Sequence, residues 1–278
     1  MARLNQKEKI NKLIIHTIII IGGLTMLFPF AWMIITALKS YGESIMIPPT
    51  LFPQEIRLDN FQKAWNALPF IDLYTNTLLL IFWRVFFALV TSSMAGYAFG
   101  RIEFPGRNVL FSIVLIQMML PPQIFIVPQY LMVAKLGWLN SITALVFPGL
   151  VSAFGTFLMR QFYKGIPKDI EEAAILDGCN HFTIFRKIML PLSKNNLVAL
   201  AIFTALFAYK ELMWPLIANM SLEKMTLSSA IASLKGQYDT EFPVVMSASF
   251  IAMWPMLLLY IVFQKHFIQG IAFTGSKG

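Results

Sequence analysis

Six apolar stretches, each long enough to cross a lipid bilayer, constrain this chain more than any other feature of its sequence. A helix needs about 20 apolar residues to span the hydrocarbon core of a membrane. The stretches lie near Leu13–Leu38, Leu73–Phe99, Val109–Val133, Ile142–Phe162, Leu197–Ala218 and Pro243–Phe263. Backbone groups inside lipid must be satisfied within their own segment, which helices achieve. The predicted fold class is therefore all-α: a polytopic membrane helical bundle of six transmembrane helices, forming a single domain over residues 1–278.

The charged residues support this fold class. They make up 13% of the chain, against about 25% in soluble domains. If the N-terminus is cytoplasmic, fourteen lysines and arginines fall inside and six outside, as the positive-inside rule requires. The net charge of +8 therefore indicates membrane orientation and not nucleic-acid binding. We expect a multi-pass protein of the cytoplasmic membrane, with both termini on the cytoplasmic side.

One charge-dense segment, residues 168–191, separates the fourth and fifth stretches on this cytoplasmic side. Its residue pattern predicts two short helices with a break between them. Pro167 suits a first helical turn, and Gly178 suits the left-handed residue that ends a helix. Asn180 is expected to cap the second helix, and Pro191 to stop it.

The second of these helices is predicted to carry an apolar stripe beside Arg186 and Lys187. The stripe consists of Phe182, Phe185, Ile188 and Met189. A compact pair of helices at a membrane surface, with one apolar face, indicates a segment that docks into another protein.

This segment resembles the EAA loop of bacterial ABC importer permeases. The matching residues are Glu172-Ala173-Ala174, then Asp177-Gly178, then Ile188, Leu190 and Pro191, in the pattern E-A-A-x-x-D-G-x(9)-I-x-L-P. In that family the loop is the coupling helix, which seats in a cleft of the ATP-hydrolysing subunit. The resemblance implies an ATPase-coupling role for the following residues: Glu171, Glu172, Ala173, Ala174, Asp177, Gly178, Ile188, Leu190 and Pro191.

The resemblance covers nearly the whole chain and points to the carbohydrate-uptake branch of these permeases. The second stretch ends in the pattern A-x-Y-A-x-x-R, here Ala95–Arg101. Membership would imply a translocation subunit that imports sugars by alternating access, with oligosaccharides, including acidic ones, as candidate cargo. It would also imply a second homologous permease in a heterodimer, two ATP-binding subunits and an external solute-binding protein. The sequence lacks the phosphate-cradling pattern G-x-x-x-x-G-K-[ST], so ATP and Mg are expected on the partner ATPase, and no cofactor in this chain.

Polar residues inside the apolar stretches are the candidates for a substrate pathway: Arg84, Gln117, Gln123, Tyr209, Lys210, Glu211 and Trp214. A charge at membrane depth is costly unless it meets water or a partner. In one interpretation Glu211 pairs with Arg84, or with the partner permease, and holds the bundle together. In the other, Lys210 or Arg84 faces the cavity and attracts an anionic sugar. The family pattern W-N-[DE]-x-x-x-P has Tyr209 and Lys210 here in place of Trp and Asn.

Two other functional classes fit the sequence less well. An ion-coupled secondary transporter would need paired intramembrane acids and an internal repeat, whereas Glu211 is the one acid well inside a stretch. A membrane enzyme would need a catalytic cluster, but His16, His181 and His266 are isolated in the sequence. The lone Cys179 excludes an internal disulfide and a thiolate metal cluster. We therefore expect neither catalytic residues nor a metal site.

Overall fold

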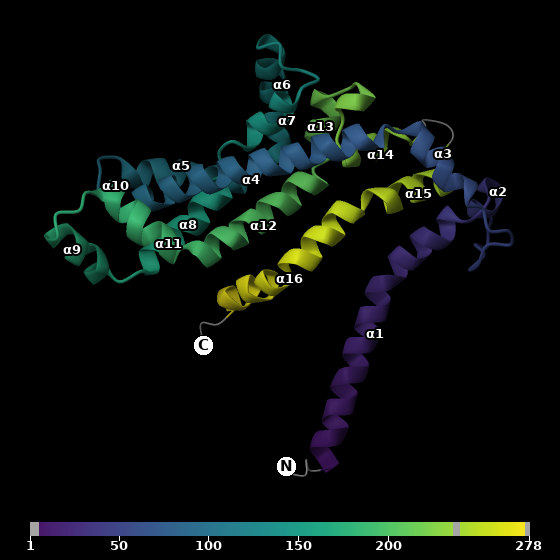
Figure 1. Ribbon diagram of the computed structural model, residues 1–278, viewed down its shortest axis with the longest axis horizontal. Coiled ribbons are helices and arrows are strands. Elements are labelled where there is room, and N and C mark those ends of the chain that lie inside the picture. The colour runs from purple at the N-terminus through teal and green to yellow at the C-terminus, as the bar shows by residue number, and fades with distance from the viewer. Residues whose placement is uncertain (1–5, 236–239, 276–278) are drawn as a thin grey trace. The chain divides into compact units, whose positions relative to one another are not determined.

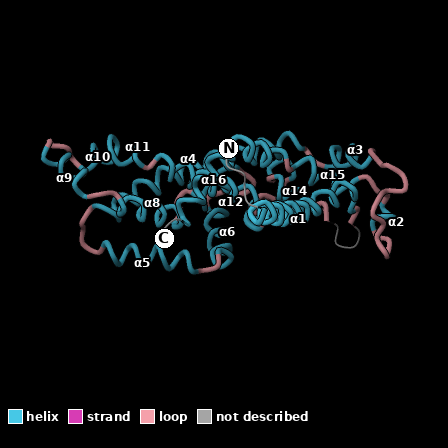
Figure 2. The backbone as a smooth tube through the Cα atoms, turned by 90° about the horizontal axis from the view of Figure 1, so that it is seen from below, coloured by secondary structure: helices cyan, strands magenta, loops and turns pink. Residues whose placement is uncertain are grey.

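The computed structural model describes residues 6–235 and 240–275, and every regular element in these two ranges is a helix (Figure 2). This confirms the all-α class. Figure 1 labels the helices in chain order. The chain divides into two compact units, Met1–Leu68 with Ser233–Met253, and Pro69–Ala232 with Trp254–Gly278. The prediction of a single domain over residues 1–278 stays a prediction.

Three helices are long and apolar enough to cross a membrane alone: Ile10–Ala37, Phe70–Arg101 and Phe242–Gln264. Three pairs of helices satisfy the same criterion together but are bent at a break. These are Arg107–Met119 with Pro122–Lys135, bent by 104°, Ile142–Gly149 with Ala153–Gly165, bent by 41°, and His181–Leu192 with Lys194–Lys210, bent by 75°. If each bent pair is one span, the described residues hold six spans, as predicted.

The first unit contains α1 (Gln6–Ala37), α2 (Tyr41–Ser44), α3 (Asp59–Ala67) and α15 (Phe242–Ala252). Helix α15 packs against the other three, and the rings of Phe61 and Phe250 meet edge to face with centroids 5.9 Å apart. In α1, residues 10–31 are all exposed, and residues 18–31 are apolar apart from Thr25. Such a helix is suited to lipid.

A polar framework organises the segment that follows α1. Lys39 is only 1% exposed; its ammonium donates to the Thr50 carbonyl at 2.5 Å and lies 4.6 Å from the centroid of the Trp32 ring. The Glu43 carboxylate accepts hydrogen bonds from the Thr50 hydroxyl, at 3.0 Å, and from the Gln54 N–H, at 2.9 Å. Side-chain contacts therefore hold the segment between α1 and α3 in a defined fold.

The second unit is built around α4 (Phe70–Arg101), against which α8 and α12 pack. The close packing depends on small residues, the usual device where helices meet in lipid. A Cβ on Gly96 of α4 would lie 2.5 Å from the Cβ of Met159 on α8. The unit also contains α5 (Arg107–Met119), η1 (Pro122–Phe125), α6 (Ile126–Lys135), α7 (Ile142–Val146), η2 (Phe147–Gly149), α8 (Ala153–Gly165), α9 (Lys168–Leu176), α10 (His181–Ile184), η3 (Phe185–Met189), α11 (Leu190–Leu192), α12 (Lys194–Lys210), α13 (Met213–Ala218), η4 (Leu222–Lys224) and α16 (Trp254–Gly275), and α14 (Leu227–Ser233) begins in it.

The fifth apolar stretch is interrupted where the sequence predicts one helix. Helix α12 ends at Lys210, Glu211 is extended, and α13 begins at Met213. Pro215 explains the break, because a proline ring clashes with the carbonyl four residues earlier, here that of Glu211. That carbonyl instead accepts a hydrogen bond from the Ser228 hydroxyl at 2.7 Å, which satisfies it inside the membrane.

Candidate functional site

The loop between α8 and α12 begins with α9, whose limits follow local rules. Pro167 directly precedes the helix, and Gly178 ends it with a φ of +81°, a conformation that suits glycine. The Gly178 N–H donates to the Ile175 carbonyl and the Cys179 N–H to the Ala174 carbonyl, both at 2.9 Å. These two bonds form the Schellman motif, which confirms the prediction that Gly178 ends the helix.

The second helix of the loop starts as predicted but continues further. The Asn180 side chain accepts a hydrogen bond from the Thr183 N–H at 2.8 Å, which confirms the cap. The prediction that Pro191 stops the helix is wrong, because helical structure runs through Pro191 to Leu192. A wide π-type turn over Phe185–Met189 ends two residues before the proline. We attribute the wide turn to Pro191, because proline distorts the turn that precedes it.

The wide turn also changes which side chains face the core. Ile184 and Met189, five residues apart, are both fully buried, whereas an α-helix would turn them to different faces. Phe182 of the predicted apolar stripe is 65% exposed, whereas Met189 of the same stripe is buried, so the four residues do not form one exposed face. Ile188 and Leu190 are half-buried, and Pro191 is exposed.

Helix α9 has two contrasting faces. Glu171 and Ala174, three residues apart, are buried, as helical periodicity requires for one face. Glu172, Ala173 and Leu176 form the opposite face and are exposed, Leu176 by 88%. We call six exposed residues of the loop the knuckle face: Glu172, Ala173, Ile175, Leu176, Asp177 and Phe182.

The buried face of α9 is tied to the end of α4. The Glu171 carboxylate accepts a hydrogen bond from the Tyr97 hydroxyl at 3.0 Å and forms an ion pair with Arg101 Nε at 3.0 Å. His181 Nδ1 lies 3.9 Å from the same carboxylate. Arg101 also donates to the Ile166 carbonyl at 2.9 Å, just before α9. We call Tyr97, Arg101 and Glu171 the latch.

The sequence analysis missed Tyr97 and Arg101 as partners of the loop. Both belong to the pattern A-x-Y-A-x-x-R, which marks the end of the second stretch. The pattern places the two side chains on one helix but contains nothing about Glu171, which lies 74 residues beyond Tyr97.

An apolar cluster backs the latch. Its buried members come from α4, α8, both helices of the loop and α12: Tyr97, Met159, Tyr163, Ala174, Ile184, Met189 and Leu200. In Figure 1, α9 and α10 lie at the end of α4 remote from α13. The loop is therefore packed onto one end of this unit, and its knuckle face is exposed.

A second charged cluster lies near the middle of α4. Arg84 Nη1 and Glu211 Oε2 form an ion pair at 2.5 Å, which confirms the predicted pairing of these two residues. The Arg84 guanidinium also donates from Nε and Nη2 to the Leu145 carbonyl, at 3.1 and 2.6 Å. The cluster joins α4 to α7 and to the break in the fifth stretch.

The other predicted pathway residues do not gather around this pair. Gln117 and Gln123 are exposed on α5 and η1. Trp214 is buried, and its indole N–H donates to the Ala144 carbonyl at 2.9 Å, which is a packing role.

Two further candidates, Tyr209 and Lys210, directly precede Glu211 at the end of α12. Tyr209 is half-buried near the end of α12. Lys210 is exposed, with its ammonium 4.9 Å from the centroid of the Phe207 ring. Of the seven pathway candidates, the structure brings together Arg84 and Glu211.

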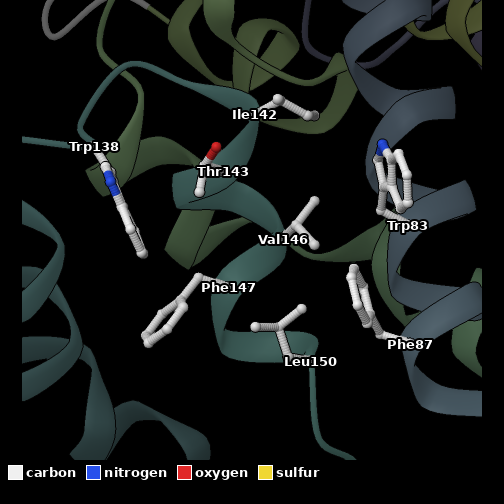
Figure 3. Close-up of a pocket in the computed structure, with 8 residues that line it drawn as sticks. All are labelled: Trp83, Phe87, Trp138, Ile142, Thr143, Val146, Phe147 and Leu150. Carbon is white, nitrogen blue, oxygen red and sulfur yellow. The ribbon is translucent and has the colours of Figure 1, made fainter. Parts of the chain in front are cut away.

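A cavity of about 340 Å³ lies beside α4 (Figure 3). Figure 3 shows Trp83 and Phe87 on one side, across from Val146 and Leu150. Its walls are almost entirely hydrocarbon, with one hydroxyl, that of Thr143, and they include none of the predicted pathway residues: Trp83, Phe87, Trp138, Ile142, Thr143, Val146, Phe147 and Leu150. A sugar needs more polar partners than these. Among the described residues, no group of three or more His, Cys, Asp or Glu side chains could hold a metal ion.

Comparison with known proteins places this geometry in context. Residues 70–273 match the protein family described as "Binding-protein-dependent transport system inner membrane component". The chain is 32% identical to the arabinooligosaccharides transport system permease protein AraQ of Bacillus subtilis (strain 168), covering 92% of each chain. It is 31% identical to the sn-glycerol-3-phosphate transport system permease protein UgpE of Salmonella typhi, covering 92% of this chain and 94% of the relative.

A solved structure has the same fold. It is a chain from a bacterial ABC transporter involved in the import of the acidic polysaccharide alginate. The TM-score is 0.75, with 22% sequence identity, and the match covers 96% of this chain and 100% of that chain.

Proposed function

This chain belongs to the family of binding-protein-dependent transport system inner membrane components, and from that premise we propose that it is the translocation subunit of an ATP-driven carbohydrate importer. It is a multi-pass membrane protein. In this proposal it pairs with a second, homologous permease, and an external solute-binding protein delivers the cargo. Two ATP-binding subunits carry out ATP hydrolysis and hold ATP and Mg. The orientation has both termini in the cytoplasm; residues 1–5 and 276–278 lie outside the described range.

The knuckle face is the observation that carries this proposal. A large apolar side chain such as Leu176 gains free energy when it leaves water, yet α9 leaves it exposed while burying the charged Glu171. If α9 faced only solvent, it would be more stable with Leu176 buried and Glu171 exposed. An apolar patch at the end of a latched loop is what a docking surface for an ATP-binding subunit requires.

The proposed mechanism uses this surface as a lever. ATP binding closes the two ATP-binding subunits, the loop moves with them, and the bundle changes between inward-facing and outward-facing states. Such a change requires each ligand to bind one state more tightly than the other. The Arg84–Glu211 pair argues against ion coupling, because Glu211 is engaged by an arginine and is not a free acid.

We further propose that the cargo is an oligosaccharide. The name of the relative AraQ, an arabinooligosaccharides transport protein, supports this cargo class. An acidic cargo would require a free positive charge along the pathway. Glu211 already neutralises Arg84, so Lys210 is the pathway candidate that could supply such a charge.

Co-purification tests the docking role. The double variant Leu176→Glu/Phe182→Glu places two charges in the apolar part of the knuckle face. We expect the variant to reach the membrane at the wild-type level but to lose the co-expressed ATP-binding subunits during affinity purification. Glu103→Gln is the matched control, since Glu103 is exposed in the loop between α4 and α5 and should leave the subunits bound. Retention of the ATP-binding subunits by the double variant at the wild-type ratio would contradict the proposal.

A further inference from the structure

We infer that Glu171 is a positioning residue that transmits movement of the loop to α4 through Tyr97 and Arg101. The sequence predicted Glu171 as one more contact of the ATPase-coupling surface. The structure turns its carboxylate away from that surface and into the unit. The inference rests on the proposed function, because it concerns the route by which displacement of the knuckle face enters the bundle.

The contacts of the latch carry the inference. Glu171 is 8% exposed, whereas its neighbour Glu172 is exposed. Each carboxylate oxygen of Glu171 has its own partner on α4: Oε1 accepts from the Tyr97 hydroxyl and Oε2 pairs with Arg101 Nε. Two partners one helical turn apart fix both the position and the rotation of α9 against α4.

Arg101 extends the attachment beyond Glu171. Its Nη2 donates to the carbonyls of Ile166, at 2.9 Å, and Pro167, at 3.1 Å. These two residues form the link between α8 and α9, so the point where the chain enters the loop is also held by α4. One guanidinium thus joins the first turn of α9 and its entry segment to the same helix.

The covalent connections of the loop are less direct routes for movement. Helix α8 ends at Gly165, and the two-residue link to α9 follows. On the other side, the wide turn over Phe185–Met189 separates α10 from α12. The latch connects α9 to α4 directly, without passing through the link or the wide turn. Breaking a buried ion pair by removing one partner leaves a charge uncompensated, so the latch is expected to hold while the loop moves.

The experiment follows α4 directly and needs no cargo. Cys179 is the one cysteine of the chain, so Cys179→Ser gives a cysteine-free background. In it, Ile71→Cys carries an environment-sensitive fluorophore near the start of α4, at the end remote from the latch, where Ile71 is exposed. The protein is purified with its co-expressed ATP-binding subunits, and the fluorescence change on adding ATP with EDTA is recorded.

We expect ATP to change the fluorescence in the otherwise unaltered protein. Tyr97→Phe and Glu171→Gln should reduce the amplitude of that change by about fivefold or more, the lower end of typical coupling between sites, while both keep the ATP-binding subunits bound. Tyr97→Phe removes only a hydroxyl and keeps the packed ring, so it serves if Glu171→Gln folds poorly. Asp169→Asn, an exposed acid in the same first turn, is the matched control and should leave the amplitude unchanged.

Three results would overturn the inference. They are an unaltered amplitude in both latch variants, no ATP-dependent change at Ile71→Cys in the otherwise unaltered protein, and loss of the ATP-binding subunits from Glu171→Gln but not from Asp169→Asn. The last would make Glu171 a docking contact. Failure of the proposed function looks different, because the unaltered protein would then retain no ATP-binding subunits.

Discussion

Among single residues, Glu211 and Arg84 have the largest predicted effect on stability. Glu211→Gln would leave the Arg84 guanidinium inside the unit without a counter-charge. Losing one partner of a buried pair costs about 3–5 kcal/mol, and since the Glu211 side chain keeps 30% exposure we expect on the order of 2 kcal/mol. Thermal unfolding in detergent measures the loss. The neighbouring Lys210→Gln should have little effect, and an equal loss in both variants would contradict the prediction.

Substitution of Gly178 is expected to lower stability through the backbone conformation alone. In Gly178→Ala the new Cβ would meet open space, so the cost comes from the left-handed backbone alone and should be about 1–2 kcal/mol. Gly165→Ala is the matched control, because a Cβ there also meets open space and its φ is not positive. Denaturation measures the free energy of unfolding of each variant relative to the wild type. If Gly165→Ala is the more destabilised, the argument from φ fails.

Residue patterns predicted the local features of the loop well and its distant partners poorly. The roles of Gly178 and Asn180 follow from φ angles and hydrogen bonds within a few residues, which sequence spacing encodes. The contact between Glu171 and Tyr97 depends on how α8 folds back along α4, and no local rule contains that information. The hydrogen bond of Trp214 was unpredictable for the same reason, since its partner carbonyl lies 70 residues away.

At the scale of elements, the packing of α4 against α8 yields a prediction with an internal control. Gly96→Ala would place a Cβ 2.8 Å from the Arg160 backbone nitrogen, so the two helices would have to separate. Overpacking of this kind costs about 1–3 kcal/mol. In Gly100→Ala, one turn later on the same helix, the nearest atom is 3.4 Å away, and the effect should be small. The melting temperatures of the two variants distinguish them, and equal values would rule out close packing as the cause.

The bent spans mark the limit of reasoning from apolar length. Stretch length and hydropathy predict six spans but do not locate the breaks, because a break depends on where backbone carbonyls find other partners. At Glu211 that partner is the Ser228 hydroxyl, a residue beyond the stretch itself. Proline indicates where a break can occur, as Pro215 does, but Pro191 shows that a wide turn can absorb a proline without ending the helix.

At the scale of the whole molecule, orientation in the membrane is the main testable property. In a Cys179→Ser background expressed without the ATP-binding subunits, Leu176→Cys should react with a membrane-impermeant maleimide in inside-out vesicles and remain unlabelled in intact cells. The physical reason is the excess of lysine and arginine on that side. Ile47→Cys is the mirror control, since Ile47 is 93% exposed in the segment expected outside. Labelling of Leu176→Cys from outside the cell would refute the orientation.

In the proposed orientation the segment around Lys39 lies outside the cell, and its fixed fold has a consequence for a protein that binds there. A flexible segment would lose backbone conformational entropy when a partner binds it, and that loss would lower the affinity. Here the hydrogen bonds of Lys39 and Glu43 already fix the conformation of the segment in the absence of a partner. A partner protein therefore binds a preorganised surface, and its affinity depends on how well the two surfaces match.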